Sequence, residues 1–464
     1  MEVITRLHWR LIAALTVALT AMPGLALASE EAISPADTGF VLIASAMVML
    51  MVPGLALFYG GMVSKKNVIN VLMMSFAVFA LVSVIWVLWG YSLAFGTSIG
   101  SLIGSLEFIG FKGVGMDPNG TLPHSAFAVF QMMFAGLTVA LISGALAERM
   151  RFSAWLIFGA LWATFVYSPV SHWVWGGGWI GAMGALDFAG GTVVHINSGV
   201  AGLVGALVLG ARKGYGKRPM PPHHLPMVLL GAGLLWFGWF GFNAGSALAA
   251  NGQAANAFLV TQVAAAAAAL AWIVAEWARH GKPTVLGAVS GSVAGLVSIT
   301  PAAGFVDPLG AIAIGVGGGL LCFFGVTVLK QKLGYDDSLD VFGIHGLGGT
   351  WGALATGIFA TSAIGGHDGL LYGNQGQLGI QAISVVATYL FSGIMTFGIL
   401  KVVGVIVPLR VTENDEDTGL DISQHGENAY SDVISGGSML AREAQGIPAT
   451  AQARETVSSP SLGG

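Results

Sequence analysis

The chain consists largely of long apolar runs that contain very few charged side chains. Of its 464 residues, 55% are hydrophobic and only 9% are charged, whereas about 25% of residues are charged in soluble domains. An apolar run of about 20 residues is long enough to cross the hydrocarbon core of a bilayer as a helix. Because backbone polar groups must be satisfied internally in lipid, many such runs predict an all-α membrane protein.

The apolar runs predict eleven membrane-spanning helices. Their expected limits are 38–62, 68–96, 125–147, 153–174, 190–211, 226–248, 257–278, 285–300, 309–331, 342–362 and 378–407. The eighth run is short and rich in glycine and serine. The first five spans and the next five each end with a span that contains a histidine. An odd number of spans in each half predicts two inverted five-helix repeats, as in many transporters.

The positions of lysine and arginine predict the orientation in the membrane. If the mature N-terminus lies outside, the opposite set of loops carries twelve basic residues: Lys65, Lys66, Arg149, Arg151, Arg212, Lys213, Lys217, Arg218, Arg279, Lys282, Lys330 and Lys332. The outer loops carry Lys112 alone. Because basic loops stay in the cytoplasm, we expect an outer N-terminus and a cytoplasmic C-terminus.

The two ends of the chain differ in composition from the spans. Arg6 and Arg10 precede an apolar core, and Ala26-Leu27-Ala28 resembles a cleavage site, so we predict a cleaved signal peptide over 1–28. An uncleaved first helix is the alternative. The membrane domain is then 29–410 and the cytoplasmic tail 411–464. The tail is acidic over 411–430 and rich in Ser, Gly and Ala over 431–464, where we expect disorder.

Two histidines lie in apolar, glycine-rich spans and share one local pattern. His195 and His345 are 150 positions apart, and both read H-x-x-x-G-x-x-G. Ionisable side chains at membrane depth are costly and usually face a pathway. A neutral imidazole offers one donor and one acceptor, so two rings bonded edge to edge would share one hydrogen. Burial disfavours the imidazolium, so we predict a pore lining that accepts a small polar solute. A structural role and haem ligation are the alternatives.

Aromatic residues gather at the predicted outer ends of three spans. They include Phe134, Trp175 and Phe242, and Ser246 follows nearby. An aromatic belt at the membrane interface explains most residues of this kind. The alternative is a cation site, because aromatic faces attract a small cation by about 1–2 kcal/mol when partly desolvated. A hydroxyl such as Ser246 could accept a hydrogen bond from an ammonium-type ion.

Four further polar residues and a cysteine have competing interpretations. Asp187 lies eight residues before His195 and is predicted to cap a helix, to attract cations or to take part in proton transfer. Glu148, Arg149 and Arg151 are interpreted as a surface ion pair and a topological anchor. Cys322 lies in an apolar run and is expected to be a small buried hydrophobe.

Several longer stretches resemble the ammonium transporter/Rhesus (Amt/Rh) family, on its bacterial ammonium transporter branch. They are PGLALFYGGMVSKKNV, GALAERMRFSAW, HWVWGGGWIGAMGALDFAGGTVVHIN, GWFGFNAGSA, AGLVSITPAAGF, DVFGIHGLGG and GLDISQHGENAY. They are spread along the chain, and the resemblance extends from about 38 to 430. The 34 residues after Tyr430 extend beyond the usual pattern of the family.

The resemblance implies the function and the site residues. It implies a homotrimer with one pore in each protomer, in the bacterial inner membrane, and no enzymatic activity, cofactor, metal or nucleic-acid partner. Phe134, Trp175 and Ser246 resemble the external ammonium site, Phe134 and Phe242 the phenyl gate, and His195 and His345 the twin histidines of the pore. Asp187 resembles the entrance aspartate.

Residues 411–430 resemble the segment that couples protomers and assists docking of a PII-type (GlnK-like) signal protein. A passive channel for NH3 or CO2 and an ammonium sensor are the alternatives.

Overall fold

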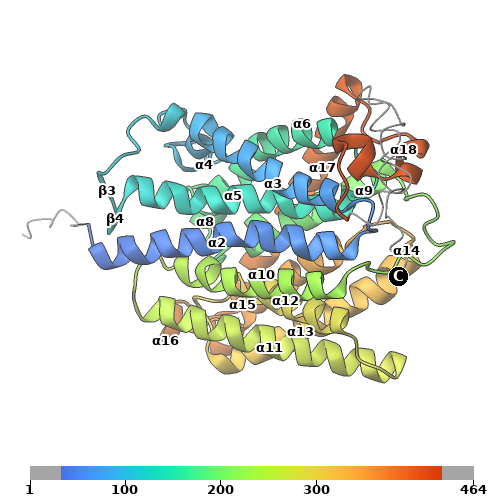
Figure 1. The fold of residues 1–464 in the computed structure, drawn as a ribbon. Helices are drawn as coiled ribbons and strands as arrows, with labels where there is room; N and C mark the ends of the chain where they lie inside the picture. Colours follow the sequence, from blue (N-terminus) through green and yellow to red (C-terminus); the bar gives the residue numbers. More distant parts are fainter. Residues whose placement is uncertain (1–32, 431–464) are drawn as a thin grey trace, which may run out of the picture.

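The computed structural model describes residues 33–430, which form a bundle of helices lying side by side (Figure 1). Within this range, nine helical segments are long and apolar enough to cross a membrane. They are α2 (Pro35–Met62); α3 (Val68–Ile85) with η1 (Trp86–Gly90) and α4 (Tyr91–Phe95); α5 (His124–Leu146); α6 (Phe152–Trp162) with η3 (Ala163–Tyr167), α7 (Ser168–Val174) and α8 (Trp179–Ala182); η4 (Gly191–Ile196) with α9 (Asn197–Leu209); α10 (Leu225–Gly245); α11 (Gly252–His280); α13 (Pro308–Phe324) with η5 (Gly325–Leu329) and α14 (Lys330–Leu333); and α17 (Gln375–Ile406).

Nine of the eleven predicted spans therefore coincide with long apolar helices. The other two positions are helical as well, but shorter or richer in glycine. They correspond to α12 (Val285–Ile299) and to η6 (Phe342–Gly346) followed by α15 (Leu347–Phe359). The 15 residues of α12 extend only about 23 Å, less than the ~30 Å hydrocarbon core. That these two helices cross the membrane stays a prediction, as do the inverted repeats. The predicted signal peptide and residues 431–464 lie outside the described range.

Polar side chains fix where several helices begin. The Ser34 hydroxyl accepts a hydrogen bond from the backbone N–H of Asp37 at the start of α2. Asn251, Thr284 and Asp307 accept in the same way at the starts of α11, α12 and α13. Each of these side chains satisfies a backbone donor that the first helical turn leaves free. The breaks between apolar runs are thus encoded by capping residues as well as by loss of hydrophobicity.

The two ends of the bundle carry different structures. At one end lie two short antiparallel hairpins, β1 (Ser98–Ile99) with β2 (Ile103–Gly104) and β3 (Pro118–Asn119) with β4 (Leu122–Pro123). This end also carries η2 (Ile109–Phe111), α16 (Ser362–Gly365) and η7 (Leu370–Tyr372). At the opposite end lie α14, α18 (Glu413–Thr418) and η8 (Asp421–His425) (Figure 1). The charged tail and the basic loops therefore share one end of the molecule.

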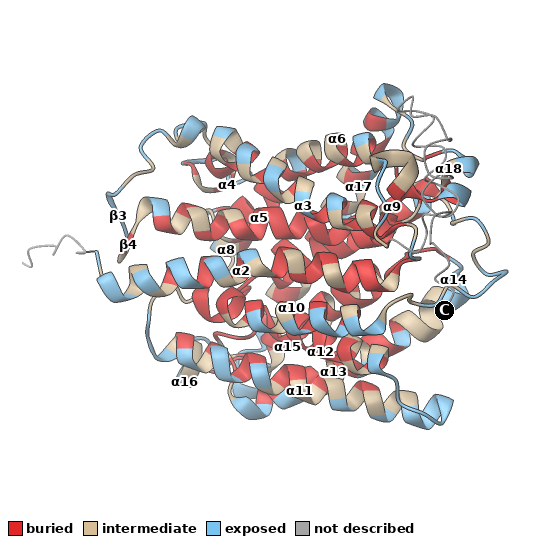
Figure 2. Cartoon of the chain, viewed as in Figure 1, coloured by how far each residue is buried: buried red, intermediate tan, exposed pale blue. Residues whose placement is uncertain are grey.

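Burial is concentrated along the axis of the bundle. Figure 2 shows buried residues on inner helices such as α5, whereas outer helices such as α11 alternate between buried and exposed residues. Small residues allow the inner helices to approach closely. A Cβ on Gly231 of α10 would overlap the backbone of Phe58 in α2, and one on Gly238 would overlap Met51. Such contacts between small residues are the usual basis of helix packing in membranes.

Candidate substrate path

The two histidines lie in π-helical turns at the starts of two inner helical segments. His195 belongs to η4, which continues into α9, and His345 belongs to η6, which continues into α15. A π-turn inserts an extra residue into the helix and is frequent at functional sites. The sequence pattern did not reveal these turns, because hydrophobic periodicity does not separate a single π-turn from an α-helix.

The imidazoles of His195 and His345 contact each other directly. Their Nδ1 atoms are 3.2 Å apart, and the ring planes differ by 22°. Both side chains are buried, with 1% and 4% exposed. One hydrogen shared between the Nδ1 atoms makes one ring the donor and the other the acceptor. This spacing leaves no room for a haem iron between the two nitrogens, because each metal–nitrogen bond alone takes about 2 Å.

The glycines of the shared pattern explain how the histidines meet. A Cβ on Gly199 would overlap the backbone of Gly346, and one on Gly349 would lie 3.0 Å from the Cβ of His195. Each glycine follows its own histidine by four residues and packs against the other histidine segment. The H-x-x-x-G pattern therefore encodes a close crossing of two helices, and this crossing brings the two rings together.

A column of aromatic rings continues from His195 toward the end with the hairpins. The rings of His195 and Phe242 lie 6.0 Å apart with their planes at 28°. Phe242 stacks on Phe134 with 4.1 Å between ring centroids. Phe134 in turn meets Trp175 edge to face at 6.0 Å. The two phenylalanines are almost fully buried, so the stacked pair separates the histidines from Trp175.

Trp175 and Ser246 lie where two helices end. Trp175 follows α7, and its indole Nε1 donates to the backbone carbonyl of Asp187 over 2.8 Å. Ser246 follows α10, and its hydroxyl donates to the carbonyl of Phe242 over 2.9 Å. Both side chains are half-buried. With its hydrogen used in this way, the Ser246 oxygen still has lone pairs that can accept a hydrogen bond from a cation.

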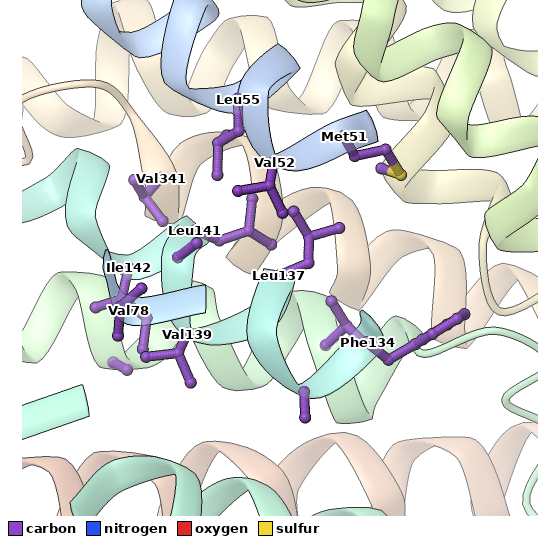
Figure 3. Close-up of a cluster of buried hydrophobic side chains, with 14 of the residues drawn as sticks. Met51, Val52, Leu55, Val78, Phe134, Leu137, Val139, Leu141, Ile142 and Val341 are labelled. Atoms are coloured by element: carbon purple, nitrogen blue, oxygen red, sulfur yellow. The ribbon is translucent and has the colours of Figure 1, made fainter. Parts of the chain in front are cut away.

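A narrow apolar cavity lies beside the two histidines. Its volume is about 10 Å³, close to the ~10–15 Å³ that one water molecule needs. Besides the imidazoles, it is lined by Met51, Leu55, Phe58, Tyr59, Leu137, Leu141, Leu235, Trp239 and Val293. Figure 3 shows the side chains of α2 and α5 in this region, including Met51, Leu55, Leu137 and Leu141. Within the described range, Nε2 of His195 has no hydrogen-bond partner, so a polar atom is available in apolar surroundings.

Wider cavities lead from His345 toward the end with the tail. One of about 150 Å³ is lined by His345, Tyr59, Trp272, Glu276 and Asp340. Next to it, a cavity of about 470 Å³ also contacts Asp340 and is bordered by basic side chains. The path thus widens from a cavity with room for one small molecule at the histidines to an open basin at this end.

Asp187 serves as a cap for the helix that carries His195. Its carboxylate accepts hydrogen bonds from the backbone N–H groups of Gly190, Gly191, Thr192 and Val193, and from the Thr192 hydroxyl. Only 7% of Asp187 is exposed. The capping interpretation of this residue therefore agrees with its contacts, and the other two interpretations stay open.

Asp337 is a counterpart of Asp187 that the sequence interpretation missed. It precedes His345 by eight residues, as Asp187 precedes His195. Its Oδ2 accepts the backbone N–H of Phe342, at the start of η6, over 2.7 Å. The full pattern is therefore D-x7-H-x3-G-x2-G in both halves, and this longer match could have been found by aligning the two histidine segments. The shared cap supports the predicted internal repeat.

The interpretation of Glu148 and Arg149 as a surface ion pair is wrong. Arg149 is fully buried and donates to the carbonyls of Gly210 and Asp336 and to the Ser338 hydroxyl. Its burial lowers the pKa of the guanidinium to about 10. Glu148 pairs instead with Arg212. The two neighbours separate because a buried arginine needs several acceptors at once, and backbone carbonyls supply them.

Arg212 joins two carboxylates at the wide end of the path. Its guanidinium contacts Glu148, and it donates to Asp336 at 2.8 and 2.9 Å. Burial alone would raise the pKa of both carboxyl groups, but hydrogen bonds and the charge of Arg212 bring each pKa below its ordinary value. This cluster ties three loops of the bundle together.

The described part of the tail packs against the same end of the path. Lys66 donates to the carbonyls of Glu416 and Asp417 over 2.7 and 2.6 Å. The carboxylate of Glu416 pairs with Arg410, and that of Asp417 pairs with Lys213. Further along, Asp421 accepts the backbone N–H of Asn70 over 2.8 Å. Three acidic residues of 411–430, namely Glu416, Asp417 and Asp421, therefore contact the rest of the chain, whereas the side chains of Glu413 and Glu427 are exposed.

These features define a polytopic helical membrane protein with a narrow internal path, closed by aromatic rings at one end and widening at the other. A family model described as the Ammonium Transporter Family matches residues 39–430. The ammonium transporter of Bacillus subtilis (strain 168) is 58% identical over 403 residues, which are 86% of this chain and 99% of that protein. The ammonium transporter of Aquifex aeolicus (strain VF5) is 52% identical over 418 residues, 89% and 98% of the two chains.

Solved structures show the same likeness. The crystal structure of Saccharomyces cerevisiae Mep2 matches with a TM-score of 0.79 and 39% identity, over 84% of this chain and 90% of that chain. A structure titled Sensor Amt Protein matches with a TM-score of 0.79 and 29% identity, over 84% and 98% of the two chains. The chain therefore belongs to the ammonium transporter family. The relatives from Bacillus subtilis and Aquifex aeolicus are named ammonium transporters, and they indicate no enzymatic activity.

Proposed function

We propose that this chain carries ammonium across the bacterial inner membrane by binding NH4+ outside and passing neutral NH3 through the path. The contact between two buried imidazoles directly beyond a stacked phenyl pair carries the proposal. The cavity beside them fits a solute of about the size of water, and NH3 is of that size. The low charge of the lining favours a neutral species over an ion.

Recruitment is assigned to the half-buried Trp175 and Ser246 together with the buried ring of Phe134. An ammonium ion held against the aromatic faces gains about 1–2 kcal/mol when partly desolvated, and it can donate to the Ser246 oxygen. Beyond this point the stacked rings of Phe134 and Phe242 act as a gate. They must move apart for each passage, because their centroids are only 4.1 Å apart.

Deprotonation before the gate accounts for selectivity. A charged group at mid-bilayer costs about 2.5–3.5 kcal/mol even on the mildest scales, and neutral NH3 avoids most of this. An alkali ion has no proton to release and so meets the full barrier. The proton released outside the gate passes first to water at that end. His195 and His345 offer one acceptor and one N–H to the NH3, and their shared hydrogen allows the pair to relay a proton across separately. Transport by this route is electrogenic.

The basin at the other end is assigned to the cytoplasm, together with the basic loops and the tail. The N-terminus is then periplasmic. Because the family resemblance implies a trimer, we assign three protomers to a homotrimer, each with its own path. A PII-type signal protein docks at the basin, next to residues 411–430.

Currents from proteoliposomes test the proposal against its rivals. A pulse of ammonium onto liposomes with the full-length protein is expected to give a transient current that empty liposomes lack. Acidity changes without current, under any gradient, would instead indicate a passive channel for NH3. If the protein gives no current and no uptake, a sensor function is indicated. The likeness to a sensor Amt protein points to this alternative.

A further inference from the structure

The outward face of α17 is a continuous apolar stripe with one interruption. Its exposed members follow helical spacing and are Ile383, Val386, Leu390, Ile394, Phe397 and Val405. Lys401 falls in the same stripe, one turn after Phe397, and is the single charged residue among the 32 of α17. An exposed apolar face on a membrane helix contacts lipid, so Lys401 places an ammonium group against the bilayer.

This ammonium group lies near the C-terminal end of α17 and has no carboxylate partner in the described part of the chain. Lys401 precedes the end of α17 at Ile406 by five residues, about 7.5 Å along the helix. Its Nζ lies 5.1 Å from the centroid of the Phe397 ring, which is one turn further into the bilayer. Among residues 33–430, no aspartate or glutamate forms an ion pair with it. A lysine near the end of a lipid-facing helix usually directs its charge to the interface or to an anion there.

A groove runs beside Lys401 between α9 and α17. It has a volume of about 450 Å³ and is lined by Val204, Leu207, Val208, Gly393, Phe397 and Lys401. At Gly393, α17 comes close to α9, because a Cβ there would lie 3.6 Å from Cγ1 of Val200. The groove is therefore apolar along its length and positively charged at one place, in the half of the membrane that contains the C-terminal end of α17.

We propose that this groove binds an anionic phospholipid of the cytoplasmic leaflet. One acyl chain lies along Val204, Leu207 and Phe397, and the phosphate pairs with Lys401. The charge selects an anionic lipid, since basic residues near the membrane surface attract such lipids by about 1 kcal/mol each. The inference rests on the proposed orientation of the C-terminal end, but not on the species transported or on its mechanism.

Native mass spectrometry of the full-length protein in mild detergent tests the site. The protein is titrated with phosphatidylglycerol or phosphatidylcholine, and the affinity of the first bound lipid is measured. We expect tighter binding of phosphatidylglycerol, and Lys401→Met should weaken it about fivefold, which corresponds to ~1 kcal/mol. Lys401→Arg should keep the preference. Lys282→Met is the matched control, because Lys282 is exposed and lies outside the groove.

Leu207→Trp provides an independent test, because it fills the groove and leaves Lys401 in place. We expect this variant to lose the tight lipid as well. Equal binding of phosphatidylglycerol by wild type and Lys401→Met, or no preference over phosphatidylcholine in wild type, would overturn the proposal. A changed oligomeric state in Leu207→Trp would overturn it too, because the face would then lie between copies of the chain. Ammonium currents of the same variants report separately on transport.

Discussion

In the part of the chain that the structure describes, three titratable side chains line the narrow cavity. They are those of His195, His345 and Tyr59. The rest of the lining is apolar, so each polar atom there has a large effect. A buried polar atom without a partner costs about 1–3 kcal/mol, and Nε2 of His195 is such an atom. A passing NH3 can remove this cost by hydrogen bonding, which gives the solute a favourable position in an otherwise apolar cavity.

Asp187→Asn is expected to destabilise the protein without changing how transport depends on pH. The carboxylate accepts four backbone N–H groups, whereas an amide turns an NH2 group toward some of them. The expected loss is about 1–3 kcal/mol, measured as a lower thermal midpoint. Asp117→Asn, at an exposed outer position, serves as the control. A shifted pH profile of transport in Asp187→Asn would contradict a purely structural role.

The two histidines could be identified from the sequence as candidate path residues, but the partners of the buried charges near the path could not. His195 and His345 stand out because ionisable groups are rare in apolar runs, and in the structure their Nδ1 atoms lie 3.2 Å apart. Arg149 was misinterpreted, because its acceptors at Gly210 and Asp336 are distant in sequence. Adjacent charges suggest a local ion pair, and only the packing of the loops shows otherwise.

The crossing of η4–α9 with η6–α15 determines how far apart the imidazoles lie. Gly199→Ala is expected to push the two segments apart, because its Cβ would overlap the backbone of Gly346. Overpacking of this kind costs about 1–3 kcal/mol and should also reduce ammonium transport. Gly398→Ala is the matched control, since a Cβ there has no neighbour within 4 Å. Unchanged transport and thermal midpoint in Gly199→Ala would contradict the close crossing.

The loop before η6 carries a pH-dependent contribution to stability. Asp337 is fully buried, and burial raises its pKa to about 6, above its ordinary value of 3.8. Its ionised form therefore costs stability above pH 6, by about 3 kcal/mol, and this cost disappears as the pH falls toward 4. Asp337→Asn does not carry this cost. The thermal midpoint of the variant relative to that of wild type should therefore be higher at pH 7.5 than at pH 4.5. A difference that does not vary with pH would contradict this.

At the scale of the whole molecule, the tail is held beside the wide end of the path by contacts with three loops. Lys66→Met removes both hydrogen bonds to the carbonyls of Glu416 and Asp417. We expect faster hydrogen exchange over residues 412–426, measured by mass spectrometry. Lys65→Met is the matched control, because Lys65 is the exposed neighbour. Equal protection of the tail in both variants would show that Lys66 does not hold it.

The arrangement of spans was the most predictable part of the whole fold. Nine predicted spans coincide with long apolar helices, because hydrophobicity over about 20 residues is a strong signal. α12 and the segment of η6 and α15 are weaker cases, since 15 residues or many glycines dilute that signal. The docking of the tail could not be predicted from composition, because an acidic run without its partners is indistinguishable from a solvated one.

The selectivity of the current in proteoliposomes tests the proposed mechanism. Ammonium and potassium pulses are applied to liposomes that contain wild type, His195→Ala or His345→Ala, at equal protein density. We expect wild type to give a current with ammonium and none with potassium, and each variant to lose the ammonium current or to conduct potassium. An unchanged ammonium current with unchanged exclusion of potassium in both variants would contradict the role of the two histidines.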